Sequence, residues 1–330
     1  MRRRAFIALL GGGAMAWPLL ARARRADRMR RIAVLMGMAE DDAGAQRRVE
    51  AFERRLQELG WVAGRNVRIE YRWSAGEAVR ARSAAKELAG LAADVLVGHT
   101  VLPALALSQA TSITPIVFTA VGDPIYYGLV ESLARPGGNI TGFTNFAPAL
   151  GAELLALLKE MAPRLTRVAV MFNPDVDPTS VAFAGAAAAS AEALAVESIF
   201  APIYAPAEIE VALEMLGREP GGGLILPPND FASIHQKSII ALAARYRLPA
   251  IYGPRHFAAA GGLMSYGIDP IAQFRAVATY VDRILRGEQP AELPVRAPTK
   301  FELVINRKTA ATLGLELPPM LLARADEVIE

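Results

Sequence analysis

Apolar residues follow two patterns in turn along the start of the chain. Residues 30–38 (RRIAVLMGM) contain a short unbroken apolar run, which is typical of a buried strand. In residues 40–60, apolar side chains recur instead at helical spacing, with acids ahead of them and Gly60 as a helix-ending residue. The residues on this apolar face are Val49, Phe52, Leu56 and Leu59. A strand followed by a helix predicts an α/β fold.

The next segment, residues 66–73 (NVRIEYRW), alternates strictly between apolar and charged side chains. Strands inside a parallel sheet are apolar on both faces, because helices cover both. We therefore predict that this strand lies at a sheet edge, with one face partly in water.

Strand and helix then continue to take turns. After a Pro-Gly-Gly turn and a strand-like stretch in residues 135–146, a second series of the same kind begins. The expected helices are 77–91, 102–110, 150–161, 180–194, 207–216 and 234–246, and the expected strands are 94–98, 115–120, 167–174, 196–200, 222–228 and 249–253. This order predicts two tandem α/β halves with parallel, doubly wound sheets.

A third piece begins at residue 261. It contains a strand-like stretch, a helix with an apolar face, a last strand at residues 301–305 and short helical segments to the end of the chain. The apolar face of the helix consists of Ile271, Phe274, Val277, Val281 and Ile284.

The first 23 residues have the layout of an export signal. Arg2–Arg4 form a basic head, residues 5–20 are apolar, and Ala21-Arg22-Ala23 is a small-x-small cleavage site. Residues 3–7 also resemble a twin-arginine signal, which exports folded proteins. We expect cleavage after Ala23 and a soluble periplasmic protein; the alternative is an uncleaved anchor.

This segment accounts for much of the basic character of the chain, whose formal net charge is +3. It holds four of the 36 basic side chains and no acid, so the remaining 32 face 33 acidic ones, a net charge of −1. We therefore expect no nucleic-acid partner, because binding nucleic acid needs basic residues across the folded body. The absence of cysteine excludes disulfides, a thiolate nucleophile and a Cys-based zinc site.

Ligands of open α/β sheets bind beyond the carboxyl ends of the strands. The residues at or near the expected strand ends are mostly small, polar or aromatic, which suits a pocket with a few convergent polar groups. We predict that the ligand-binding residues are Gly37, His99, Thr100, Asp123, Asn173, Asn229, Asp230, Tyr252 and Tyr266.

Several of these residues have a structural alternative. Asp123-Pro124 is ordinary turn chemistry, and Asn173 is suited to capping the next turn. Tyr252 and Tyr266 suit half-buried rings whose hydroxyls bond water, and His99 suits either a ligand contact or a structural role.

Motifs for cofactors are absent from this sequence. Gly221–Gly223 precede their strand, on the wrong side to hold a phosphate, and no P-loop occurs. Residues 262–267 (GLMSYG) miss the Gly-x-Ser-x-Gly pattern by one position. The three histidines have no metal-like spacing, so we predict no cofactor and no metal.

One family resembles the mature chain as a whole. The shared motifs are VGDP, SLARPGGNITGFTNF, VAVMFNPD, GGLMSYGID, YVDRILRGEQPAELPV and PTKFELVINRKTAATLGLELP. As a set they resemble the periplasmic substrate-binding components of ABC importers, in the branch with tryptophan-binding proteins. The resemblance implies a type I periplasmic-binding-protein fold: two Rossmann-like lobes, a multi-strand hinge and a ligand in the cleft. The implied lobes are residues 30–145 with 267–298, and 146–266 with 299–330.

The resemblance also implies functions for the strand-end residues. Relatives that bind aromatic amino acids use a small-hydroxyl pair, the Asp-Pro turn and polar residues in the second lobe; these positions fall on His99, Thr100, Asp123, Asn173, Asn229 and Asp230. His99 replaces a smaller residue, and the acid and amide at 229–230 are swapped, so the ligand of this chain can differ from tryptophan. The expected ligand is an amino acid or a similar zwitterion.

The expected function is a monomeric solute receptor, not an enzyme, that delivers its ligand to an ABC permease. The alternative is an exported hydrolase on the same fold that uses His99 with Asp123. That alternative needs an activated nucleophile within hydrogen-bond reach of a base, and no motif supplies one.

Overall fold

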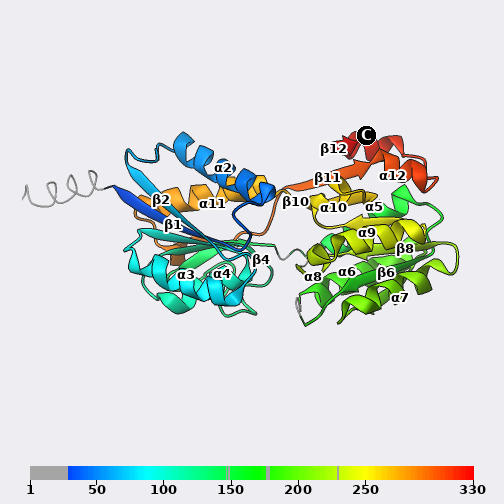
Figure 1. The fold of residues 1–330 in the computed structure, drawn as a ribbon, viewed down its shortest axis with the longest axis horizontal. Coiled ribbons are helices and arrows are strands. Elements are labelled where there is room, and N and C mark those ends of the chain that lie inside the picture. The colour runs from blue at the N-terminus through cyan, green and yellow to red at the C-terminus, as the bar shows by residue number, and fades with distance from the viewer. Residues whose placement is uncertain (1–28, 146, 148, 176–178, 229) are drawn as a thin grey trace, which may run out of the picture. The chain divides into compact units, whose positions relative to one another are not determined.

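The structure is a computed structural model that describes residues 29–330 except 146, 148, 176–178 and 229. The expected export signal therefore lies outside the described residues. The chain forms two compact units (Figure 1): unit 1 contains the residues up to Phe143 and Phe274–Val295, and unit 2 contains Thr144–Gln273 and Arg296–Glu330. The chain thus crosses between units three times. The predicted lobes change at residues 145, 266 and 298, and these bounds stay a prediction.

Unit 1 contains a five-stranded sheet in the order β2-β1-β3-β4-β5. Its strands are β1 (Arg30–Met36), β2 (Val67–Trp73), β3 (Val95–His99), β4 (Ile116–Val121) and β5 (Ile140–Thr144). Its helices are α2 (Ala43–Glu58), α3 (Ala78–Gly90), α4 (Val101–Ala110), most of α11 (Pro270–Leu285) and the 3-10 turn η2 (Pro290–Glu292).

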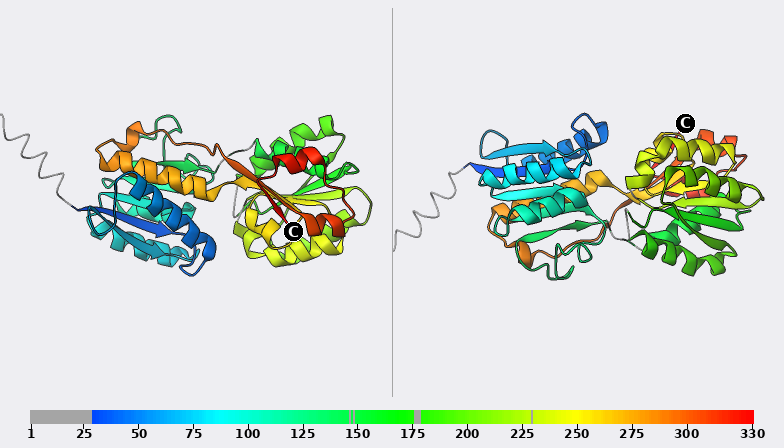
Figure 2. Two further views of the ribbon diagram at one scale, coloured as in Figure 1. Left: turned by 90° about the horizontal axis from the view of Figure 1, so that it is seen from above. Right: turned by 60° about the horizontal axis from the view of Figure 1, so that its bottom comes forward.

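Helices cover both faces of this sheet (Figures 1 and 2). The apolar sides of α2 and α11 pack with β1 and β3 on one face, and α3 and α4 pack on the other. Strand β2 lies at the edge, as its alternating sequence predicts. Its apolar residues Ile69, Tyr71 and Trp73 pack on the α2 side, which leaves the charged residues on the wetter face.

Unit 2 contains a seven-stranded sheet in the order β12-β11-β10-β9-β8-β6-β7. Its strands are β6 (Arg167–Phe172), β7 (Glu197–Pro202), β8 (Gly222–Leu226), β9 (Ala250–Tyr252), β10 (Met264–Ile268), β11 (Phe301–Asn306) and β12 (Glu327–Ile329). Its helices are α5 (Leu150–Met161), α6 (Ser180–Ala191), the 3-10 turn η1 (Glu192–Leu194), α7 (Pro206–Gly217), α8 (Asp230–Ile234), α9 (Gln236–Arg245), α10 (Arg255–Ala259), α12 (Arg307–Thr312) and α13 (Pro319–Arg324).

The sheet of unit 2 is mostly parallel, and β10 with β11 is an antiparallel pair. One face packs against α5, α6, α12 and α13, and the other against α7, α9 and α10. The predicted α/β class with two mostly parallel sheets is therefore confirmed.

Three short elements differ from the prediction. The expected helix 234–246 corresponds to α9, and residues 230–234 before it form a separate short helix, α8, that was not predicted. The backbone leaves the helical region at His235 (φ −97°, ψ 14°), which separates the two helices. The short helix α10 was not predicted, because five residues are too few to show a helical period. The expected helical C-terminus ends in strand β12, which is held by parallel pairing with β11, a long-range contact that a three-residue pattern does not reveal.

No helix in the described part of the chain combines the length and the apolar character that crossing a membrane requires.

Candidate functional site

The candidate site lies at the carboxyl edge of the sheet in unit 1. Strands β1, β3 and β4 run parallel, so their carboxyl ends meet at one edge. We call this the unit 1 edge; it consists of Gly37, His99, Thr100 and residues 119–123. Four of the predicted site residues therefore lie here.

Two residues of the unit 1 edge have strained backbones. Thr100 has φ +76° and Ala120 has φ +58°. A β-branched residue with positive φ is a genuine outlier, and such strain concentrates at functional sites. Thr100 directly follows β3, and Ala120 is the second-last residue of β4. The Thr100 N–H donates to the carbonyl of Thr119 at 2.9 Å. The surrounding structure thus holds an unfavourable conformation at two adjacent strand ends.

Gly37 permits the close approach of β1 to β3 at this edge. A Cβ at residue 37 would lie 2.8 Å from the carbonyl oxygen of His99 and 3.0 Å from Cγ2 of Thr100. Contacts below 3.0 Å are sterically forbidden for a real side chain. Gly37 therefore has a steric reason to be glycine, and its own backbone lies directly beside Thr100.

His99 is buried, with 5% of its surface exposed, and its ring lies 5.3 Å from that of Phe274 on α11. Its Nδ1 has no hydrogen-bond partner among the described residues. Burial and the charge of Arg48 lower the pKa of His99 to about 3. The imidazole is therefore neutral at physiological pH.

Thr119 pairs with His99 in the sheet and is fully buried. Alternation along a strand places both side chains on the face that α2 and α11 cover, since Val97 and Val117, two residues earlier, pack there. The hydroxyl of Thr119 also has no partner in the described part of the chain. Buried polar atoms normally have partners, so two adjacent exceptions at one strand edge call for an explanation.

Asp123 is half-buried and caps a turn. Its Oδ1 accepts hydrogen bonds from the N–H groups of Ile125 at 3.0 Å and Tyr126 at 3.1 Å. The turn role that the sequence left open is therefore present. These bonds occupy one carboxylate oxygen, and a ligand role for the other stays a prediction.

Tyr126 stands beside this carboxylate. Its side chain is 64% exposed, with its ring edge-on to that of Tyr127 at 5.1 Å. An exposed aromatic ring next to a strand-end acid was missed by the sequence analysis, which considered only the residues directly at each strand end.

The predicted residues of unit 2 have mixed surroundings. Asn173 is buried, and its Oδ1 accepts from the N–H of Asp175 at 3.0 Å, as a turn-capping residue does. Asp230 is the first residue of α8. Asn229 lies outside the described residues. Nothing in these contacts tests their predicted ligand roles.

Tyr252 is a core residue. It is 1% exposed, and its ring stacks on that of Phe257 at 4.7 Å with an interplanar angle of 13°. Burial raises the pKa of its hydroxyl. The sequence analysis expected a half-buried ring. The ring is instead fully enclosed, because it stacks on Phe257 of α10, a helix that was not predicted.

Tyr266 lies on the α5 side of the sheet in unit 2. Its ring stacks on Phe301 at 5.6 Å and borders a hollow of about 150 Å³ that Glu153, Glu160 and Arg324 also line. Burial and the neighbouring Glu153 raise the pKa of the tyrosine hydroxyl. Arg324 donates to Glu160 at 3.1 Å, so this charge pair is already satisfied within unit 2.

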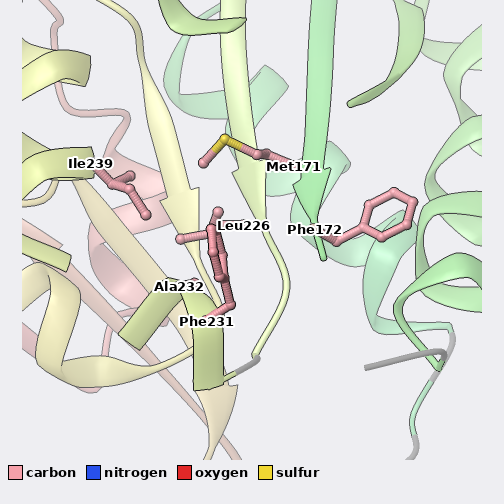
Figure 3. A pocket seen from close by; sticks show the side chains of 6 residues that line it. All are labelled: Met171, Phe172, Leu226, Phe231, Ala232 and Ile239. Carbon is pink, nitrogen blue, oxygen red and sulfur yellow. The ribbon is translucent and has the colours of Figure 1, made fainter. Parts of the chain in front are cut away.

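A second hollow lies at the carboxyl ends of β6 and β8 (Figure 3). Its lining is apolar, and the space does not admit a water molecule. Phe172 points away from the other side chains of this group (Figure 3), because it packs on the opposite face of the sheet. The lining residues are Met171, Phe172, Leu226, Phe231, Ala232 and Ile239. This hollow is packing around α8 rather than a binding cavity.

The hydrolase alternative required an activated nucleophile that works with His99 and Asp123. No hydrogen bond joins these two side chains in the described residues, and burial keeps His99 neutral. The described residues also contain no cluster of His, Asp and Glu that suits a metal ion. The structure therefore lends the hydrolase alternative no support.

Comparison with known proteins finds a family and a relative that match most of this chain. A family model described as ABC transporter substrate binding protein matches residues 31–329. The tyrosine-binding protein of Clostridioides difficile (strain R20291) is 24% identical over 268 residues, which cover 81% of this chain and 76% of that protein.

Solved structures share the fold. A conserved domain protein from Vibrio cholerae O1 biovar El Tor is 26% identical with a TM-score of 0.79, and the match covers 91% of this chain and all of that one (100%). An ABC domain from Streptococcus pneumoniae in complex with L-Trp is 24% identical with a TM-score of 0.79, covering 91% of this chain and 99% of that one. The two-lobe α/β fold predicted from the sequence is thereby confirmed.

Proposed function

The chain belongs to the family of ABC transporter substrate-binding proteins, and from this premise we propose that it captures an aromatic amino acid at the unit 1 edge and delivers it to an ABC permease. One observation supports this location: the strained Thr100 and Ala120 lie at the carboxyl ends of the adjacent parallel strands β3 and β4, at the edge where open α/β sheets bind ligands. The ligand class is supported by two relatives, one described as tyrosine-binding and one solved with L-Trp.

Each part of a zwitterion has a suitable partner at this edge. The free oxygen of Asp123 accepts from the ligand ammonium, because a cation that leaves water needs a charged partner. The hydroxyl of Thr100 and the first N–H groups of α4 donate to the ligand carboxylate. The exposed ring of Tyr126 stacks on an aromatic side chain. In unit 2, Asn173, Asn229, Asp230 and Tyr266 remain the proposed contacts, whereas the enclosed side chain of Tyr252 offers no surface to a ligand.

The protein is proposed to act in the periplasm as a monomer. The basic head, short apolar core and Ala-x-Ala end of residues 1–23 support export, and residues 3–7 resemble a twin-arginine signal. N-terminal sequencing of the exported form should start after Ala23. A membrane-bound form that still begins at Met1 contradicts this part of the proposal.

Ligand binding is proposed to be coupled to rotation about the three crossings between units. Only a few residues at these crossings need to change their backbone dihedral angles for such a rotation. Small-angle scattering should give a smaller radius of gyration once ligand saturates the protein. An unchanged radius contradicts the coupling.

A thermal-shift screen tests the ligand class. The panel contains the twenty amino acids, aromatic carboxylic acids and short sugars, and a binder raises the melting temperature by mass action. We expect the largest shifts for tyrosine, tryptophan or phenylalanine. Shifts confined to sugars contradict the proposal.

A further inference from the structure

Helix α2 carries a charged residue on its apolar face. Ala45, Val49 and Phe52 are buried against the sheet, and Arg48 lies among them at helical spacing, three residues after Ala45 and four before Phe52. An amphipathic helix normally places such a charge on the opposite side, as it does with the exposed Arg47. A half-buried guanidinium loses hydration, so it needs partners.

Its partners within the protein are few. Nη1 of Arg48 lies 3.2 Å from the sulfur of Met38, a weak acceptor. No carboxylate accepts a hydrogen bond from it among the described residues. Asp42, the acid that most affects it electrostatically, caps α2 by accepting from the N–H of Ala45 at 2.8 Å. A guanidinium has five N–H donors, so most of its bonding capacity is unused by the protein.

The position of this guanidinium ties it to the unit 1 edge. Met38 directly follows Gly37, which lies beside Thr100, so Arg48 stands over the carboxyl end of β1. Gly44 also makes room for it, because a Cβ there would lie 3.0 Å from Nη1. The positive charge of Arg48 reaches His99, whose Nδ1 is buried without a partner.

Apart from the carboxylate of Asp42, which caps α2, the groups gathered around Arg48 are electropositive or neutral. Arg48 is a cation, and His99 and Thr119 present buried polar atoms that lack partners among the described residues. The acid at the same edge is Asp123, which follows β4, two strands from β1. Neighbouring strands are about 4.8 Å apart, so the end of β1, over which Arg48 stands, and the end of β4, which Asp123 follows, are separated by about 10 Å. Such a separation orients a zwitterion, because each end attracts one charge of the ligand.

We propose that the Arg48 guanidinium binds the ligand's carboxylate, together with the hydroxyl of Thr100, and so makes a free carboxylate a requirement for binding. This rests on the proposed function, because it places an amino acid at the unit 1 edge. An arginine binds a carboxylate through two parallel N–H···O bonds, which a lysine cannot reproduce. The half-buried setting strengthens these bonds relative to those in water.

The test compares an acid with its amide on matched variants. The ligands are L-tyrosine and L-tyrosinamide, and L-tryptophan and L-tryptophanamide. The proteins are the wild type, Arg48→Met, Arg48→Lys and the control Arg47→Met, which removes an exposed charge from the same helix. Calorimetry should show that the wild type and the control bind the acid at least about 30-fold more tightly than the amide.

Arg48→Met should lose most of this preference and keep only the part that Thr100 and the N–H groups of α4 supply, and Arg48→Lys should recover only part of what is lost. If Arg48→Met keeps the wild-type preference, or if the wild type binds acid and amide alike, the proposal is wrong. These outcomes leave the proposed function standing, because the amino acid still binds.

A second measurement does not depend on identifying the physiological ligand. The side-chain Nε–Hε NMR signal of Arg48, assigned by its loss in Arg48→Met, is followed in the wild type during titration with 3-phenylpropionate and with 3-phenylpropionamide. We expect the carboxylate to shift this signal, and neither compound to shift that of Arg47. An unmoved Arg48 signal overturns the proposal. An Arg48 signal that moves, in a protein to which no amino acid binds, contradicts the proposed function alone.

Discussion

Gln273 donates a 2.8 Å hydrogen bond from Nε2 to Oδ1 of Asn145, and so joins two of the three segments where the chain passes between units. The third segment is tied to both. The N–H of Thr144 donates to the carbonyl of Arg296 at 3.0 Å, and Lys300 donates to Oδ2 of Asp269 at 2.8 Å. The three crossing segments are thus linked pairwise by specific hydrogen bonds, and substitutions there should affect stability.

The carboxylate of Asp269 accepts several hydrogen bonds, including the one from Lys300. Its Oδ1 accepts from the N–H groups of Ile271 and Ala272 at the start of α11. Burial raises the pKa of Asp269, but the hydrogen bonds from Lys300 and from these two backbone groups outweigh it, so the net pKa is lowered. A carboxyl whose pKa is lowered by folding stabilises the protein above its unfolded pKa of about 3.9, and this contribution is lost as the pH falls through the folded value.

Asp269→Asn should therefore destabilise the protein at pH 7 by about 1–3 kcal/mol, because the amide keeps the cap but turns a donor toward Lys300. Urea unfolding at pH 7 and at successively lower pH measures this. The difference between wild type and variant should shrink below about pH 4. A difference that is independent of pH contradicts the assigned pKa shift.

His99 should make the protein sensitive to mild acid. Burial and the charge of Arg48 lower its pKa to about 3, whereas the unfolded chain takes up a proton at about 6.5. The unfolded state thus binds more protons between these values, so stability falls as the pH drops from about 6.5 toward about 3. By pH 4.5 the loss amounts to about 2–3 kcal/mol.

His99→Gln should remove most of this loss, which unfolding in urea at pH 7.0 and pH 4.5 detects. His256→Gln is the matched control, because the side chain of His256 is exposed and its replacement should leave the loss intact. Equal acid sensitivity in all three proteins would show that His99 is not held neutral by its surroundings.

Gly37→Ala should destabilise the protein and weaken ligand binding. The added Cβ lies 2.8 Å from the backbone carbonyl of His99, so β1 and β3 must shift apart at the unit 1 edge. Overpacking of this kind costs about 1–3 kcal/mol. Gly90→Ala at the end of α3 is the control, because a Cβ there meets nothing within 4 Å, and we expect it to be neutral or stabilising. If the melting temperature of Gly37→Ala equals that of the control variant, Gly37 does not lie as close to His99 as in this structure.

The sequence predicts the framework of this fold well, for physical reasons. Apolar runs and helical periods report burial directly, so α5 has the predicted bounds, and the strict alternation of residues 66–73 placed β2 at the edge. What failed depended on long-range contacts. Strand β12 is held by its pairing with β11, and Tyr252 is enclosed by a helix too short to predict.

The candidate site was predicted only in part. The rule that ligands bind at the carboxyl ends of strands identified the unit 1 edge. The rule considers only residues at or just after the end of a strand. Arg48 projects to the same edge from a helix, and so the rule does not find it. The signal was nevertheless present in the sequence, as a single arginine between the buried positions Ala45, Val49 and Phe52.

The last prediction separates the two roles of Asp123. Its Oδ1 caps the turn by accepting from Ile125 and Tyr126, and an asparagine in its place keeps that oxygen and the cap. Asp123→Asn should therefore shift the melting temperature of the ligand-free protein by no more than about 1 °C. The substitution removes the negative charge that attracts an ammonium group, so it should weaken the binding of an amino acid by about 2–5 kcal/mol. Calorimetry with the strongest ligand of the screen measures both proteins, and an asparagine variant that binds as tightly as the wild type makes Asp123 a turn residue alone.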